Sequence, residues 1–175
     1  MCIRDSLNDY YDVRLKNYRI NSLLCQAEPH QPVSLSKVSE RLAKADLSNK
    51  SLSFYQVDIE EKKSVDALFG RHKFKSVLNL AARAGVRYSM ENPHVYMTTN
   101  AIGTLNLLEG MRNNDVKKMV LASTSSLYAG QEMPFVETLP VNTPISPYAA
   151  SKKACLLYTS PSPRDATLSR MPSSA

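Results

Sequence analysis

The chain has 175 residues, of which 43% are hydrophobic and 22% are charged, as is ordinary for one globular domain with a buried core. The Lys and Arg residues exceed the Asp and Glu residues by six, but they are scattered and form no stripe of the kind that binds nucleic acid. No apolar run is long enough to span a membrane or to act as a secretory signal, so we expect a cytoplasmic protein with neither a nucleic-acid nor a membrane partner.

The N-terminal half predicts two helices around one strand. Apolar residues recur at helical spacing from Asn8 to Cys25, which indicates an amphipathic helix. Residues 29–50 are polar and rich in Pro and Ser, so we predict a loop there, with room for a short helix at 38–43. Alternation from Leu52 to Ile59 predicts a strand, and Lys63 to Phe69 a short helix.

The C-terminal half alternates strands and helices. We predict buried strands at Ser76–Ala82 and Lys118–Ser123. Pro93 opens the longest predicted helix, which ends near Arg112, and Ser146-Pro147 opens a helix that ends at Ala154. Strands that alternate with helices indicate parallel βαβ units and an α/β fold.

The two ends of the chain differ from the rest. Residues 155–175 are rich in Pro and Ser and show no periodicity, which predicts disorder and an abrupt end to the preceding helix. This tail and residues 1–6 both resemble translated adapter sequence, although a natural disordered tail is the alternative. We therefore predict a non-native leader at 1–6, one domain at 7–154 and a disordered non-native tail at 155–175.

A Tyr and a Lys stand four residues apart on the last predicted helix. Tyr148 and Lys152 therefore point to the same side, and the hydroxyl cluster at 123–126 follows a buried strand, where a parallel sheet builds its site. A phenol is a poor base at neutral pH, but a nearby cation favours its ionised form, and Thr124 could share the proton of a substrate hydroxyl. The alternative is a surface Tyr/Lys pair beside a loop that only caps a helix.

The cysteines give no sign of a metal centre. Cys2, Cys25 and Cys155 are unevenly spaced and include no Cys-x-x-Cys pair. This spacing favours neither a disulfide framework nor a zinc site, and it suits a reducing compartment. We predict no bound metal.

Four ordered stretches resemble successive landmarks of the nucleotide-sugar epimerases, which belong to the NAD-dependent epimerase/dehydratase family of the extended short-chain dehydrogenase/reductase type. The stretches are Asn8–Asp12, Asn79–Ser89, Ser123–Tyr128 and Ser146–Lys152. The likeness is greatest to the UDP-glucuronate 4-epimerases, and it runs from about Leu7 to Ala154. Four motifs in order are far more specific than one Tyr/Lys pair.

The resemblance implies an NAD-dependent isomerase that acts on a UDP-sugar. Its reaction would be the UDP-glucuronate to UDP-galacturonate type of 4-epimerisation, by transient oxidation at C4. Tyr148 would be the catalytic acid and base, Lys152 would hold the nicotinamide ribose, and Thr124 would share the proton of the 4-hydroxyl.

The resemblance also implies two binding sets. The cofactor set comprises Asp58, Ile59, Asn79, Leu80, Ala81, Ala82, Asn100, Tyr148 and Lys152. The substrate set comprises Thr124, Ser125, Ser126 and Arg87. A uronate carboxylate needs hydroxyl or guanidinium partners, which Ser125, Ser126 and Arg87 could supply. Arg87 could equally form a surface pair with Glu91 at i,i+4.

The chain departs from the family at its N-terminal side. It contains no G-x-x-G-x-x-G turn to hold a pyrophosphate, and the second strand of the fold is almost wholly missing. Asp5 stands where the family's ribose-binding acid would be, but it lies in the suspect leader. We expect a partial Rossmann-like doubly wound parallel sheet that lacks its first strand and most of its second, with strand 3 parted from strand 4.

Three alternatives to an epimerase stay open. A nucleotide-sugar dehydratase or decarboxylase of the same family would normally carry an acidic residue among positions 124–126, where this sequence has none. The others are a non-catalytic nucleotide-binding module and a truncated reading frame without function, since this chain is expected to be inactive alone. A homodimer through the helices at 93–112 and after Ser146 is expected by analogy.

Overall fold

A computed structural model describes residues 1–25, 46–48 and 52–159, which fall into two compact units divided after Asp58. The short helix predicted at 38–43 lies outside the described residues. Within the described ranges no helix is both long enough and apolar enough to cross a membrane.

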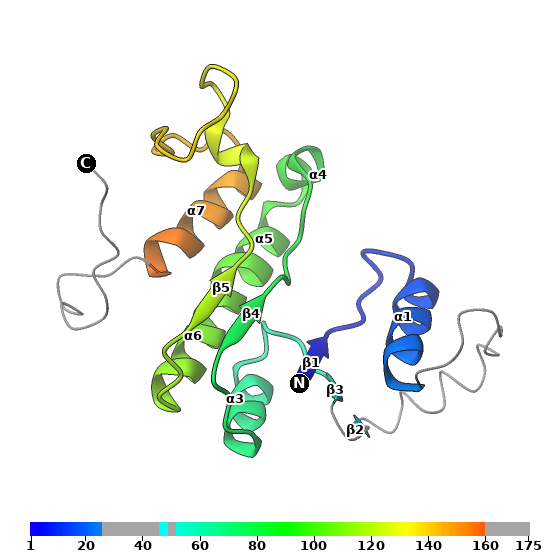
Figure 1. The fold of residues 1–175 in the computed structure, drawn as a ribbon. Coiled ribbons are helices and arrows are strands. Elements are labelled where there is room, and N and C mark those ends of the chain that lie inside the picture. The colour runs from blue at the N-terminus through cyan, green and yellow to red at the C-terminus, as the bar shows by residue number, and fades with distance from the viewer. Residues whose placement is uncertain (26–45, 49–51, 160–175) are drawn as a thin grey trace. The chain divides into compact units, whose positions relative to one another are not determined.

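The first unit contains a three-stranded sheet in the order β1-β3-β2 (Figure 1). Its strands are β1 (Cys2–Asp5), β2 (Asp46–Ser48) and β3 (Ser53–Gln56), with β1 parallel and β2 antiparallel to β3. The predicted strand at 52–59 is thus confirmed, while β2 forms where a loop was expected. Helix α1 (Val13–Cys25) begins later than predicted because the Asp12 carboxylate accepts a hydrogen bond from the Arg14 N–H at 2.8 Å, as a helix cap does.

Residues 2–5 belong to the fold. Ile3 pairs with Phe54 in the parallel register, and its partly buried side chain packs against Ile20 and Phe54. The domain was expected to begin at residue 7, and β1 adds residues 2–5 to the first unit, because an apolar residue with a strand beside it gains more by burial than by staying in water. The non-native origin of the segment stays a prediction.

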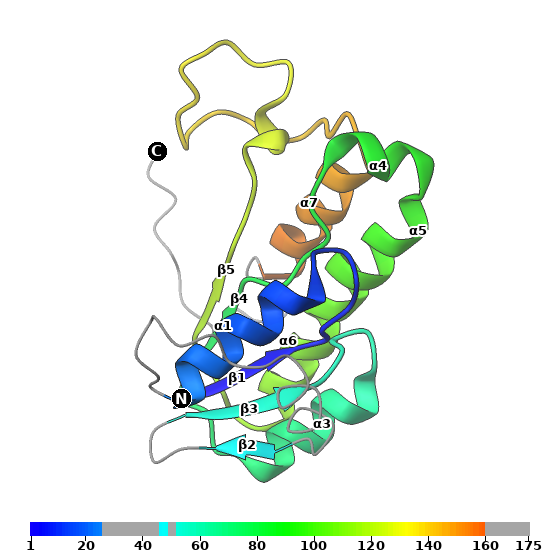
Figure 2. The same ribbon diagram turned by 90° about the vertical axis from the view of Figure 1, so that its right-hand side faces the viewer.

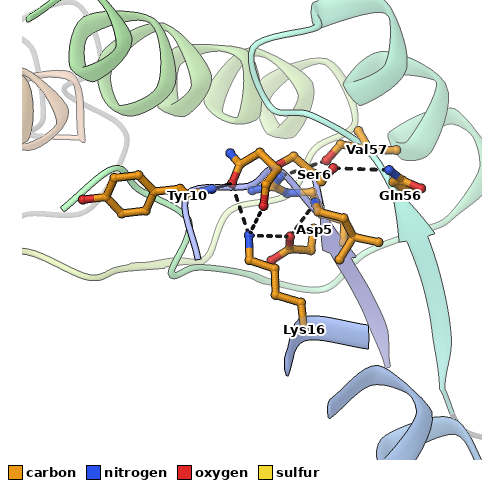
Figure 3. A network of polar contacts seen from close by, with 9 residues as sticks. Asp5, Ser6, Tyr10, Lys16, Gln56 and Val57 are labelled. Atoms are coloured by element: carbon orange, nitrogen blue, oxygen red, sulfur yellow. Dashed lines mark hydrogen bonds and ion pairs between the residues drawn. The ribbon is translucent and has the colours of Figure 1, made fainter. Parts of the chain in front are cut away.

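A network of polar contacts lies where β1 ends (Figure 3). The Asp5 carboxylate accepts a hydrogen bond from the Leu7 N–H at 2.7 Å and lies 3.8 Å from the Lys16 ammonium. Lys16 also donates to the Asn8 carbonyl oxygen at 2.9 Å. These contacts fix the loop between β1 and α1 and hold Asp5 at the carboxyl end of its strand.

The second unit is built on two parallel strands, β4 (Val77–Asn79) and β5 (Met119–Leu121), which pair residue for residue from Val77 with Met119 to Asn79 with Leu121. Its helices are α3 (Lys62–Arg71), α4 (Val86–Glu91), α5 (Pro93–Tyr96), the π-helix η1 (Met97–Ile102), α6 (Gly103–Asn113), the 3-10 helix η2 (Ser125–Tyr128) and α7 (Pro147–Thr159). Each predicted element of this half is present, whereas α4 was not predicted.

The long predicted helix is three consecutive segments. α5, η1 and α6 follow one another without a break, and the π-helical turn lies in the middle. Downstream, α6 lies so close to α3 that a Cβ on Gly110 would come within 2.7 Å of the Phe69 ring. Gly103 lies equally close to Ile59, and the Asn106 amide donates to the Ile59 carbonyl oxygen at 2.8 Å.

The helices leave one face of the β4–β5 pair uncovered within this unit. α5, α6 and α7 all lie on the same side of the strands (Figures 1 and 2). Leu78 and Val120 are register partners, and each is 62% exposed. These two side chains therefore form a small apolar strip on the other side.

Helix α7 continues to Thr159 and does not stop at Ala154. Cys155 is 2% exposed, and its thiol donates to the Asn100 carbonyl oxygen at 3.1 Å. The tail predicted to be disordered from residue 155 is thus wrong for residues 155–159, because Cys155 faces the helix layer and its burial extends α7 by a turn. The rest of that tail lies outside the described residues.

Candidate active site

The carboxyl ends of β4 and β5 lie at the same edge of the sheet, because the two strands are parallel. Asn79 ends β4 and is buried, and its amide donates to Thr104 Oγ1 at 3.3 Å. Its Oδ1 accepts from the Ala81 N–H at 3.2 Å, which turns the chain immediately after the strand. Asn79, Ala81 and Ala82 therefore line this edge, whereas the Leu80 side chain between them is 67% exposed.

A lysine ties helix α7 to the end of β5. Lys152 Nζ donates to the Ala122 carbonyl oxygen at 2.6 Å, and the residue is only 4% exposed. Burial lowers the pKa of Lys152, because removing the ammonium from water disfavours its charged form. The contact places the Lys152 side chain beside the segment that leads from β5 into the hydroxyl cluster.

The hydroxyl cluster begins with a capping threonine. Thr124 is extended, and its Oγ1 accepts from the Ser126 N–H at 3.2 Å, which starts η2. A threonine oxygen that accepts one bond keeps its own O–H as a donor. Ser125 is exposed and Ser126 partly buried. The expected capping role of this loop and its expected chemical role are therefore compatible.

Tyr148 stands in the first turn of α7. Ser146 is buried and caps the helix, its Oγ accepting from the Ala149 N–H at 3.1 Å. The half-buried Tyr148 ring meets the Tyr96 ring edge-on, with centroids 5.9 Å apart and planes at 70°. Tyr148 and Lys152, four residues apart on α7, lie on the helix side that faces this edge of the sheet.

Asn100 joins three elements and is 1% exposed. Its amide donates to Ser151 Oγ at 2.9 Å and to the Arg83 carbonyl oxygen at 3.1 Å, while its Oδ1 accepts from the Arg83 N–H at 2.8 Å. These bonds occupy the side chain that was expected to bind a cofactor. Asn100 connects the loop after β4 with α7 through η1, and its expected contact with a cofactor stays a prediction.

Three further expected site residues lie in other segments than the ends of β4 and β5 and α7. Arg87 is exposed on α4, and no ion pair joins it to Glu91 among the described residues. Ile59 is 1% exposed, and its side chain packs beneath Gly103, so only its backbone could border a ligand. Asp58 closes the first unit.

The sequence did not single out Tyr96, Ser151 or Asp5 as members of a site. Tyr96 was read as part of an ordinary amphipathic helix, and Asp5 was set aside with the leader. One signal was available: Thr99, Asn100 and Thr104 are polar residues in the middle of the long predicted helix, and all three are buried in the structure.

Comparison with known proteins agrees with this geometry. A family model described as GDP-mannose 4,6 dehydratase matches residues 24–161. The UDP-glucuronate 4-epimerase of Thermodesulfobacterium geofontis is 48% identical over 155 residues, which cover 89% of this chain and 41% of the relative. UDP-glucuronate 4-epimerase 1 of Arabidopsis thaliana is 34% identical over 152 residues, covering 86% and 30%. The chain thus spans less than half the length of these relatives.

Solved structures show the same likeness. The UDP-Glc/GlcNAc 4-epimerase of Campylobacter jejuni superposes with a TM-score of 0.64 at 28% identity, covering 90% of this chain and 39% of that one. The UDP-glucose 4-epimerase of Thermus thermophilus in complex with NAD gives 0.61 at 28% identity, covering 90% and 49%. These neighbours confirm the partial Rossmann-like fold. Together with the family model, which matches more than half of the residues, they show that the chain belongs to the NAD-dependent epimerase/dehydratase family.

Proposed function

We propose that this chain carries the catalytic part of an NAD-dependent nucleotide-sugar 4-epimerase whose substrate is UDP-glucuronate. The observation that carries the proposal is the 2.6 Å hydrogen bond from Lys152 Nζ to the Ala122 carbonyl oxygen. It brings the helix with Tyr148 and Lys152 to the end of β5, two residues before Thr124. The relatives named UDP-glucuronate 4-epimerase support the choice of reaction.

The residues at the end of β4 and on α7 suit a dinucleotide. A lysine ammonium has three N–H groups, so the bond to Ala122 leaves two of them for the hydroxyls of a ribose. Ala81 and Ala82 are small, which lets a ligand approach the backbone after β4. Asn100 would contribute to cofactor binding through the loop after β4, which it fixes at Arg83. Asp58 and the Ile59 backbone would border the adenine.

Within the first unit, Asp5 suits the hydroxyls of a ribose. It ends a strand parallel to β3, and a carboxylate in that position accepts hydrogen bonds from ribose hydroxyls. Asp5, Tyr11 and Lys16 also line a cavity of about 480 Å³ in the first unit. The leader would thus contribute to cofactor binding.

The chemistry follows from the side chains. A bound NAD would supply a reversible hydride acceptor for C4 of the sugar. Tyr148 removes the proton of the 4-hydroxyl and later gives it back, and Lys152 supplies positive charge on the same side of α7. Thr124, whose Oγ1 caps η2, donates its O–H to the 4-oxygen of the sugar. Ser125, Ser126 and Arg87 would receive the uronate carboxylate.

A chimera tests the proposal. The residues of the Thermodesulfobacterium geofontis epimerase that match this chain would be replaced by those of the chain, so that the relative supplies the remaining sequence. We expect UDP-glucuronate to be converted into UDP-galacturonate. Tyr148→Phe should lower kcat by about 100-fold or more, because general acid–base catalysis contributes roughly 10²–10⁴-fold.

The product decides between the epimerase and its alternatives. Nuclear magnetic resonance of the sugar product separates a 4-epimer from a 4-keto-6-deoxy sugar or a decarboxylated pentose. Tyr158→Phe is a matched control, because this tyrosine stands ten residues after Tyr148 on the same helix and is 62% exposed. A folded chimera that binds UDP-glucuronate without forming the 4-epimer would contradict the proposal.

We also propose that the active protein is a homodimer that pairs through η1, α6 and α7. Ile102 on η1 is 47% exposed and Leu157 on α7 is 64% exposed, which leaves apolar side chains on both elements. Sedimentation of the chimera tests this, and Ile102→Glu should shift a dimer towards monomer.

A further inference from the structure

Tyr96 links the Tyr148 ring to the turn before α4. It is the largest of the fully buried side chains, at 0% exposure, and its hydroxyl donates to the Ala84 carbonyl oxygen at 2.9 Å. The next residue, Gly85, has a φ of 104°, which glycine adopts without steric cost. On its other side the Tyr96 ring meets Tyr148 edge-on at 5.9 Å.

The hydroxyl and the ring of Tyr96 contact different parts of the site. The Ala84 turn ends the loop that begins after β4, and Tyr148 stands in the first turn of α7. An edge-on aromatic contact has a preferred geometry, so a buried ring restricts the orientation of its neighbour.

We propose that Tyr96 is a positioning residue whose buried ring holds the Tyr148 phenol in one orientation; the packing of this ring, which does not depend on the bond to the Ala84 carbonyl, carries the role. Tyr96 needs no contact with the substrate for this role. The catalytic consequence rests on the proposed function, because it assumes that Tyr148 exchanges the proton. The restriction of the Tyr148 ring itself does not.

Three substitutions separate the parts of this role. Tyr96→Phe keeps the ring edge and loses the bond to Ala84. Tyr96→Met fills a similar volume with a flexible apolar chain and loses the ring. Tyr18→Met removes an exposed tyrosine from α1 and serves as the matched control.

The first measurement observes the ring on the 175-residue chain. Ring signals of Tyr148 in a tyrosine-labelled sample are assigned by their loss in Tyr148→Phe. Tyr96→Met should shift these signals, because the ring current of Tyr96 is gone, and should average them, because the ring becomes mobile. Tyr96→Phe and Tyr18→Met should leave them near their original positions. Unchanged Tyr148 signals in Tyr96→Met would overturn the proposal.

The second measurement follows turnover in the chimera. Tyr96→Met should lower kcat about tenfold or more while KM for UDP-glucuronate stays within about threefold, since misplacement of a reacting group by about 1 Å can cost roughly 10²-fold. Tyr96→Phe should restore kcat to within about threefold of the parent. If Tyr96 had only a structural role, Tyr96→Met would change the melting temperature without lowering kcat at a constant KM. A mobile Tyr148 ring with unchanged kcat would also overturn the proposal. An inactive parent chimera would contradict the proposed function alone, because the ring measurement still decides on the orientation of Tyr148.

Discussion

Lys152 shows how a single residue can serve both the fold and the chemistry. Its stem is buried and its ammonium is held by a backbone carbonyl, so it packs α7 against the strand layer. The same burial lowers its pKa, which is unfavourable for the charged form. A cation is kept in such a position at a cost to stability, as is common where a charge is needed in a site.

This cost predicts a pH dependence. In the unfolded chain Lys152 keeps its proton up to its ordinary pKa of 10.5, while in the folded chain Lys152 releases the proton at lower pH because its pKa is lowered. Between the two values the unfolded state binds more protons, so rising pH favours the folded state. The free energy of unfolding of the parent should therefore rise relative to that of Lys152→Met as pH increases towards 10.5.

Urea unfolding at several alkaline pH values measures this difference. Lys153→Met, one residue further along the same helix, reports the general effect of removing one positive charge. If the free energy of unfolding changed with pH in the same way for the parent and Lys152→Met, the folded environment of Lys152 would not disfavour its charge.

At the scale of elements, two glycines set the distance between α6 and its neighbours. A methyl group on Gly110 would lie 2.7 Å from the Phe69 ring, and one on Gly103 would lie 2.5 Å from Ile59 Cδ1. Both neighbours are buried, so neither can swing into water. Asn106 lies between the glycines and bonds to the Ile59 and Glu60 carbonyl oxygens, which fixes the same approach.

Alanine substitution should distinguish these glycines from a third one. Gly110→Ala and Gly103→Ala should each destabilise the protein by about 1–3 kcal/mol through overpacking. Gly70 on α3 has open space around its Cβ position, so Gly70→Ala should stabilise by up to about 1 kcal/mol through helix propensity. Chemical denaturation of the three variants measures these effects, and equal responses at all three positions would contradict the close approach.

The sequence was informative where a local pattern decides the structure. Alternation identified the strand at β3, short apolar runs identified β4 and β5, and the Tyr148–Lys152 spacing identified one side of α7. It was uninformative where tertiary contacts decide. α4 follows a glycine with positive φ that no periodicity reveals, β1 depends on its partner β3, and the last turn of α7 depends on the burial of Cys155. Tyr96 and Asn100 gain their roles only when η1 is placed between the β4 loop and α7.

At the scale of the whole molecule, cofactor affinity should be low in this chain by itself. The 175 residues include five glycines and no G-x-x-G-x-x-G turn, so no such turn offers backbone N–H groups to a pyrophosphate. Calorimetric titration of NAD should give no saturable heat for the 175-residue chain and clear binding for the chimera. Far-ultraviolet dichroism of the same sample reports whether the helices have formed. Tight binding by the chain would show that the glycine turn is dispensable.

The uncovered strip of Leu78 and Val120 has a practical consequence for anyone who produces the protein. Among the residues that the structure describes, β4 and β5 form a two-stranded sheet, and its apolar strip offers other copies a hydrophobic surface. Concentrated preparations should scatter light increasingly with time and bind hydrophobic dyes. Glutamate at both positions should lengthen the shelf life of the sample, since like charges keep the exposed faces of neighbouring molecules apart.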